Sequence, residues 1–173
     1  LNLSFDGGRT GLVGRNGVGK TTLLGIVAGR LPPQAGTVST TGTLGVLRQA
    51  VQVAADETLA DLMGVAGALE VLRRAEEGRA TADELALADW TIEARIASAL
   101  ARVGLDVEPW TLLSALSGGQ RTRAALSALV LAEPDFILLD EPTNNLDPEG
   151  RASVIGLLST WRSGAIVVSH DRE

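Results

Sequence analysis

The chain has 173 residues, of which 45% are hydrophobic and 21% charged, a balance that argues against disorder and is typical of one folded domain. No apolar run approaches the roughly 18 residues of a membrane-spanning helix, so we expect no direct membrane insertion. Zero cysteines exclude disulfides, cysteine–zinc sites and thiol catalysis, and a net charge of −6 disfavours binding of nucleic acid by this chain alone. These features together predict a cytoplasmic protein.

The first part of the chain is predicted to form a strand, a loop and a helix in that order. Residues 10–13 predict a short buried strand that enters a glycine-rich loop at 14–19. A helix should run from about residue 20 to residue 28, where the following glycine ends it. Beyond a turn, residues 37–41 and 43–48 on either side of a glycine predict a hairpin.

The middle of the chain, residues 56–103, is predicted to be helical because apolar residues recur there at helical spacing. Thr58 with Asp61, and Thr81 with Glu84, have the spacing of capping boxes, which begin helices. The apolar stripes indicate ordinary helix packing. Their members are Leu59, Leu62, Met63, Ala66, Leu69 and Leu72, followed by Ile92, Ile96, Leu100 and Val103.

The last third of the chain alternates between helix and strand. Helices are predicted at 117–131 and 148–162. Continuous apolar runs at 136–139 and 165–169 predict parallel strands that are buried on both faces.

This alternation on both sides of the helical segment predicts the domain organisation. Strands that alternate with helices indicate an α/β fold with a mainly parallel sheet. We expect residues 1–55 and 116–173 to form the α/β core, and residues 56–115 to be an inserted helical subdomain.

Residues 14–21 match the phosphate-binding pattern G-x-x-x-x-G-K-[ST]. Glycines in this pattern let several backbone N–H groups point at one anion, which the positive end of the following helix also attracts. Lys20 should reach the β- and γ-phosphates, the Thr21 hydroxyl should ligate Mg²⁺, and Thr22 should reach the α-phosphate. The predicted nucleotide-binding residues of the loop are Gly14, Asn16, Gly17, Gly19, Lys20, Thr21 and Thr22.

The chain has 15 lysines and arginines, of which only Lys20 is a lysine, and it has one histidine, His170. Because lysine and histidine are otherwise absent, chemistry is expected at both places.

An acidic pair, Asp140 and Glu141, directly follows the apolar run at 136–139. Ligands of α/β sheets bind at the carboxyl ends of the strands. Asp140 is therefore suited to hold Mg²⁺, and Glu141 to orient or deprotonate the water that attacks the γ-phosphorus.

These motifs, together with others in the same order, resemble the nucleotide-binding domains of ABC ATPases. Residues 116–120 read Leu-Ser-Gly-Gly-Gln and match the signature of that family. Gln49 resembles the Q-loop glutamine, which contacts Mg²⁺ and the attacking water. Residues 142–147 resemble the D-loop, and His170 resembles the switch histidine that contacts the γ-phosphate.

The resemblance implies a P-loop ATPase of the ABC type that uses ATP and Mg²⁺, in a domain that would begin before residue 1 and continue beyond residue 173. The implied catalytic residues are Glu141, His170 and Gln49. The implied metal ligands are Thr21, Gln49 and Asp140. Further nucleotide contacts are implied in the signature and the D-loop. They are Ser117, Gly118, Gly119, Gln120 and Asp147.

The signature also predicts a partner. Ser117 at a helix start, followed by two glycines, offers a hydroxyl and N–H groups to an anion, although a plain helix cap would have the same sequence. A second phosphate-binding helix start is redundant within one domain. In the family, two domains pack head to tail, and each ATP lies between the phosphate loop of one and the signature of the other.

Details of the motifs resemble the ABC-F branch, whose members have two ATPase domains and act on ribosomes. Residues 140–147 resemble its D-E-P-T-N-H-L-D, with Asn145 in place of histidine, and residues 169–172 match its S-H-D-R. Gln120 departs from the glutamate common in that branch and resembles transporters instead. The alternative is therefore the ATP-binding subunit of a transporter, with a membrane subunit as its partner. A non-catalytic module that merely binds ATP is disfavoured by the presence of Glu141 and His170.

Overall fold

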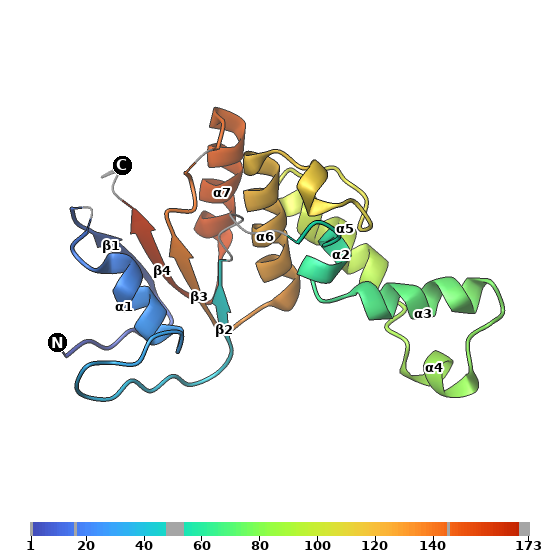
Figure 1. Cartoon of the computed structure of the whole chain (residues 1–173), viewed down its shortest axis with the longest axis horizontal. Helices are drawn as coiled ribbons and strands as arrows, with labels where there is room; N and C mark the ends of the chain where they lie inside the picture. The colour runs from blue at the N-terminus through green and yellow to red at the C-terminus, as the bar shows by residue number, and fades with distance from the viewer. Residues whose placement is uncertain (1, 16, 48–53, 145, 170–173) are drawn as a thin grey trace.

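The computed structural model describes residues 2–15, 17–47, 54–144 and 146–169. Within these ranges four strands form one parallel sheet in the order β1–β4–β3–β2 (Figure 1). The strands are β1 (Arg9–Val13), β2 (Leu44–Val46), β3 (Phe136–Asp140) and β4 (Gly164–Ser169). The predicted α/β fold with a mainly parallel sheet is confirmed.

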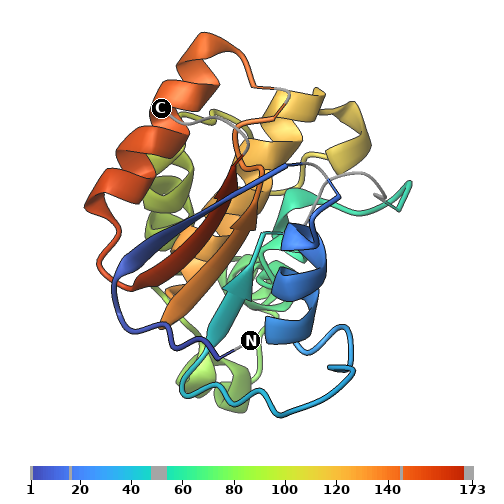
Figure 2. The same cartoon turned by 90° about the vertical axis from the view of Figure 1, so that its left-hand side faces the viewer.

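Helices cover both faces of the sheet (Figure 2). On one face, α1 (Lys20–Val27) packs Leu24 against Leu138 of β3. On the other face, α6 (Gly118–Ala132) and α7 (Pro148–Thr160) share a core with the alternate strand residues. Successive side chains of a strand point to opposite faces, so both sets are buried and the run at 136–139 is continuously apolar.

The hairpin predicted at 37–41 and 43–48 is wrong. Of the described residues in this segment, Leu44–Val46 form a strand, and this strand pairs in parallel with β3. The Asp135 carboxylate, just before β3, accepts hydrogen bonds from the Thr43 N–H and hydroxyl at 2.7 and 2.8 Å. These two bonds lower the pKa of Asp135, and the bond from the Thr43 backbone N–H has the larger effect. Thr43 is therefore bound to the start of β3, and β2 adds to the sheet instead of folding back onto residues 37–41.

Gly45, in the middle of β2, allows this strand to approach α6 closely. A Cβ at Gly45 would lie 2.6 Å from Pro134 Cγ and 2.9 Å from Leu129 Cδ2. We expect Gly45→Ala to lower the free energy of unfolding by about 1–3 kcal/mol through overpacking. Gly11 of β1 is the matched control, because a Cβ there would meet no atom within 4 Å. Urea unfolding followed by circular dichroism measures the free energy of unfolding of both variants. An equal loss of stability in Gly11→Ala would contradict the close approach at Gly45.

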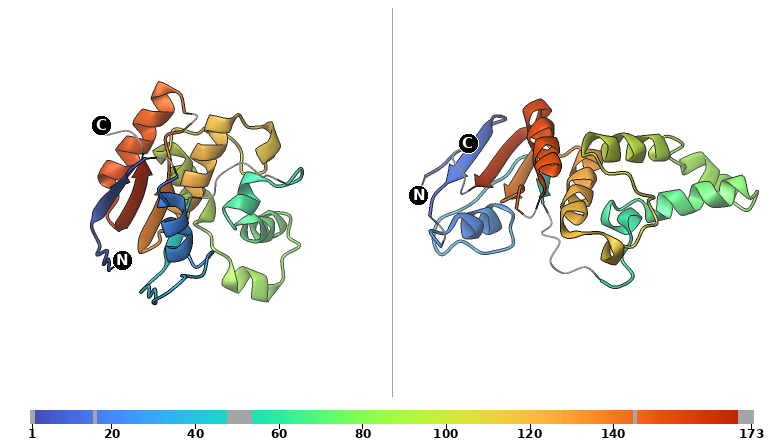
Figure 3. Two further views of the ribbon diagram at one scale, coloured as in Figure 1. Left: turned by 60° about the vertical axis from the view of Figure 1, so that its left-hand side comes forward. Right: turned by 90° about the horizontal axis from the view of Figure 1, so that it is seen from above.

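Between β2 and α6 the chain is helical, and α3 and α4 project furthest from the sheet (Figure 3). The elements are α2 (Leu59–Leu62), α3 (Ala66–Glu76), α4 (Ala82–Leu87), α5 (Ile92–Arg102) and the 3₁₀ turn η1 (Leu113–Ala115). The stripe predicted from Leu59 to Leu72 is divided between α2 and α3, because Gly64 has a φ of 71° and ends the first of them. Both parts of the stripe still face the core.

Both predicted capping boxes are confirmed. Thr58 caps α2 with Asp61, and Thr81 caps α4 with Glu84. An ion pair between Arg74 and Glu84 joins α3 to α4. None of the helices in the described part of the chain is long and apolar enough to cross a membrane.

Candidate active site

The phosphate loop connects the end of β1 to the start of α1. Gly17 and Gly19 have φ angles of 79° and 101°, which residues with a Cβ rarely adopt. Gly19 is also the N-cap of α1, so the loop passes directly into the helix start, with Thr22 in its exposed first turn. Lys20 Nζ donates a hydrogen bond to the carbonyl of Gly14 at 2.5 Å, which folds the ammonium back over the loop. An ammonium and a helix N-terminus in one place suit a polyphosphate.

The end of β3 lies beside this helix start. The Thr21 hydroxyl donates to Asp140 Oδ2 at 2.7 Å, so the structure brings together two of the three predicted metal ligands. The order of the sheet explains this proximity, since only β4 separates β1 from β3. A hydroxyl and a carboxylate are hard oxygen donors, and Mg²⁺ is commonly held by one or two such groups together with the phosphates of a nucleotide. The residues present therefore fit Mg·ATP.

Glu141 follows with a backbone conformation that non-glycine residues seldom adopt. Its φ is 49°. Its N–H donates to the carbonyl of Val168 at 3.0 Å, and its carbonyl accepts from the N–H of Asn144 at 3.1 Å. Local backbone strain of this kind costs about 1–3 kcal/mol and persists only where the surroundings hold it. Glu141 is therefore held firmly next to Asp140.

Asp147 uses its carboxylate to begin a helix. Asp147 Oδ1 accepts from the N–H of Gly150 at 2.7 Å and caps α7. The chain comes so close here that a Cβ at Gly150 would lie 2.8 Å from the same oxygen. The predicted nucleotide contact of Asp147 would thus have to share a carboxylate that already serves as a cap.

The structure does not bring the signature to the phosphate loop of the same chain. Ser117 is the N-cap of α6, with Gly118 and Gly119 in the first turn. Because α6 and α1 lie on opposite faces of the sheet, the signature residues are separated from Lys20 by the sheet (Figure 2).

The Gln120 side chain folds back onto Ser117, where the two form a capping box. The spacing Ser-x-x-Gln is the sequence signal of this cap. No such pattern indicates Arg121, whose Nε donates to the carbonyl of Leu116.

Three of the predicted site residues, Asn16, Gln49 and His170, lie outside the described residues, as does Asn145. Their roles remain predictions.

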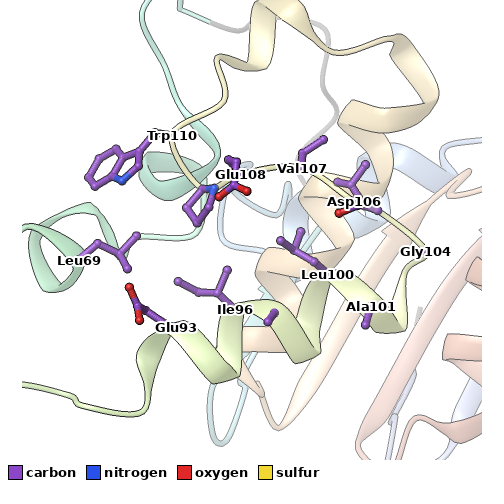
Figure 4. A pocket seen from close by; sticks show the side chains of 13 residues that line it. Leu69, Glu93, Ile96, Leu100, Ala101, Gly104, Asp106, Val107, Glu108 and Trp110 are labelled. Carbon is purple, nitrogen blue, oxygen red and sulfur yellow. The ribbon is translucent and has the colours of Figure 1, made fainter. Parts of the chain in front are cut away.

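A groove of about 650 Å³ lies between α3, α5 and residues 104–110 (Figure 4). Its apolar lining includes Ile96, Leu100 and Trp110. Three carboxylates, Glu93, Asp106 and Glu108, also line it, and it contains none of the predicted site residues. This groove is therefore distinct from the candidate active site.

A glycine-rich loop between a strand and a helix, next to an aspartate at the end of a parallel strand, defines the class of P-loop nucleoside triphosphatases. The family model described as ABC transporter matches residues 1–144. The chain belongs to this family, and it is an ATPase domain of the ABC type.

The curated relatives include members of the F subfamily, and the domain is most like that branch. The chain is 40% identical over 195 residues to human ATP-binding cassette sub-family F member 3, with 99% of this chain and 26% of the relative covered. It is 35% identical over 199 residues to the Energy-dependent translational throttle protein EttA of Mycobacterium tuberculosis, with 99% and 35% covered. The chain thus spans about a quarter to a third of the length of these relatives.

A solved structure has the same fold. It is the complex of the archaeal ribosomal stalk protein aP1 and the archaeal ribosome recycling factor aABCE1. The TM-score is 0.66 at 27% identity, and the match covers 96% of this chain and 29% of the other.

Proposed function

We propose that this domain binds and hydrolyses Mg·ATP as it closes head to tail on a second ATPase domain. One observation carries the first half of the proposal: the Thr21 hydroxyl and the Asp140 carboxylate are 2.7 Å apart, next to Lys20. The separation of Ser117 from that site by the sheet supports the second half, since a second domain would supply the missing signature. We also propose residues 1–55 and 116–173 as the core, and 56–115 as the helical subdomain.

Each residue then has one role in the composite site. Lys20, with the loop N–H groups, holds the phosphates, and Thr21 and Asp140 hold Mg²⁺ with Gln49. Glu141 accepts a proton from the attacking water, and His170 contacts the γ-phosphate. Catalysis of this kind is mostly positioning and charge stabilisation, so a domain without its partner is expected to hydrolyse ATP slowly.

We propose further that the protein acts on the ribosome in the cytoplasm, as a member of the ABC-F branch. The names of one relative and one structural neighbour support this proposal, because the first is a translational throttle protein and the second a ribosome recycling factor. The acidic charge of the chain does not oppose it, since other parts of such a protein can supply the contacts to RNA.

Ribosome binding is tested by sedimentation with the full-length protein. We expect it to co-sediment with ribosomes in the presence of a slowly hydrolysed ATP analogue and to dissociate with ADP, because only the former supports domain closure. Lys20→Ala is the matched variant, and it should stay in the supernatant with either nucleotide. Equal sedimentation of both proteins with both nucleotides would contradict ATP-dependent binding.

The alternative, an ATP-binding subunit of a transporter, has one structural observation in its favour. The groove between α3 and α5 has an apolar floor and is open to a segment of a partner protein. Purification from membranes with bound integral membrane subunits, combined with no ribosome association, would favour the transporter.

A further inference from the structure

The peptide unit that joins Leu116 to Ser117 is held at both of its polar groups by side chains of α6. Its N–H, which belongs to Ser117, donates to Gln120 Oε1 at 2.9 Å. Its carbonyl, which belongs to Leu116, accepts from Arg121 Nε at 2.9 Å. Gln120 and Arg121 are adjacent residues in the first part of the helix, and both fold back toward its start. We call this arrangement the peptide clamp.

The peptide clamp fixes the entry of the chain into α6. Leu116, the residue before Ser117, is anchored in the core, because its side chain is only 5% exposed. A peptide unit held at its N–H, its carbonyl and its neighbouring side chain cannot rotate without breaking at least one of these contacts. The orientation of Ser117 is therefore determined by the side chains of Gln120 and Arg121.

The clamp also determines what the Ser117 hydroxyl can do. Ser117 Oγ accepts a hydrogen bond from the N–H of Gln120 at 3.3 Å. A hydroxyl that accepts in this way keeps its own hydrogen for an outside acceptor. Ser117 and Gly118 are exposed, so such an acceptor can approach from solvent. An oxyanion is well suited to that place, because the helix start is positive.

We propose that Gln120 and Arg121 are positioning residues, which aim the Ser117 hydroxyl and the first N–H groups of α6 at the γ-phosphate held by the partner domain. This inference rests on the proposed head-to-tail closure. In this role Gln120 does not touch the nucleotide. Gln120 acts through its amide oxygen, and Arg121 acts through its Nε donor.

The clamp makes different demands at its two positions. A glutamate at position 120 would keep an oxygen acceptor for the Ser117 N–H, so the clamp can form with either residue at this position. At position 121, a lysine would keep the positive charge but lacks the guanidinium Nε–H that meets the Leu116 carbonyl.

The test measures how much ATP remains trapped after rapid gel filtration of the protein with both ATPase domains. Glu141 and its equivalent in the second domain are first changed to glutamine, so that closed states accumulate. We expect Gln120→Met and Arg121→Met each to raise the ATP concentration needed for half-maximal trapping by about 3- to 10-fold, as for a lost hydrogen bond. Gln120→Glu should trap ATP nearly as well as the protein with Gln120, because it keeps the oxygen acceptor. Arg121→Lys should trap ATP as poorly as Arg121→Met.

The matched control breaks the same kind of cap elsewhere. Glu84 completes the capping box of α4 with Thr81 and also pairs with Arg74, so Glu84→Met removes comparable contacts far from the signature. We expect Glu84→Met to lower the melting temperature as much as Gln120→Met does, yet to leave trapping unchanged. Equal loss of trapping in both variants would reduce the role of Gln120 to general stability, and full trapping in Arg121→Lys would show that charge alone matters.

A further variant separates failure of this inference from failure of the proposed function. Ser117→Arg places a bulky side chain at the helix start and should abolish trapping in the site to which α6 contributes. If Ser117→Arg abolishes trapping while Gln120→Met and Arg121→Met do not change it, the peptide clamp has no positioning role. If Ser117→Arg traps ATP normally, the head-to-tail closure itself is wrong.

Discussion

Changing Glu141 to glutamine is expected to leave ATP trapped between the two ATPase domains and to slow its hydrolysis about 100-fold or more, the usual contribution of a general base. The variant keeps the size and one acceptor oxygen of the side chain, but it replaces the other oxygen with an amide NH2 and removes the ability to accept a proton. The backbone of Glu141 is held by hydrogen bonds to Val168 and Asn144, so the substitution should not move the site. Nucleotide binding and closure should therefore continue while the chemical step slows.

A single-turnover assay, combined with a measurement of closure, separates these steps in the full-length protein. Glu149→Gln provides the charge control, because Glu149 is an exposed residue in the first turn of α7. It should hydrolyse ATP at the parental rate. Hydrolysis at that same rate by Glu141→Gln, in the site that contains Glu141, would show that another group activates the water.

Replacing Lys20 with alanine is expected to weaken Mg·ATP binding by about 100-fold or more. Hydrogen bonds to charged groups contribute about 1.5–3 kcal/mol each, and Lys20 is placed to reach two phosphates. Lys20 Nζ also bonds the carbonyl of Gly14, so the variant removes a contact that folds the loop. Isothermal titration of the full-length protein measures the affinity.

The control for Lys20→Ala is Arg30→Ala, which removes one positive charge from an exposed residue beyond the end of α1. Its affinity for ATP should stay within about 2-fold of the parent, because exposed charges at a distance are screened by salt. Unchanged binding in Lys20→Ala would exclude the phosphate loop as the nucleotide site.

The sheet and the phosphate loop could be predicted from sequence because local patterns determine them. Four apolar residues before Asp140 indicate burial on both faces, and Gly17 and Gly19 permit the positive φ angles of the loop. The hairpin prediction failed because β2 is only Leu44–Val46 and is held by Asp135, which is distant in the chain. A local pattern contains no information about such a partner.

The signature illustrates the same limit within the site. Its sequence indicates that Ser117 begins a helix, and this is confirmed. The sequence does not indicate that Arg121 reaches back to Leu116, because that bond depends on how the chain enters the helix. Nor does the sequence place Ser117 across the sheet from Lys20, since that follows from the packing of α1 and α6 on different faces.

The placement of α1 and α6 on different faces of the sheet also has a thermodynamic consequence. The head-to-tail pair would contain two nucleotide sites. Each domain would supply the phosphate loop of one site and the signature of the other, so a single closing motion would complete both. ATP bound at the first site would then stabilise the closed pair and raise the affinity at the second, and linkage requires the same factor in the other direction. Binding curves of the paired domains should accordingly be sigmoidal, with a Hill coefficient between 1 and about 2, the number of sites.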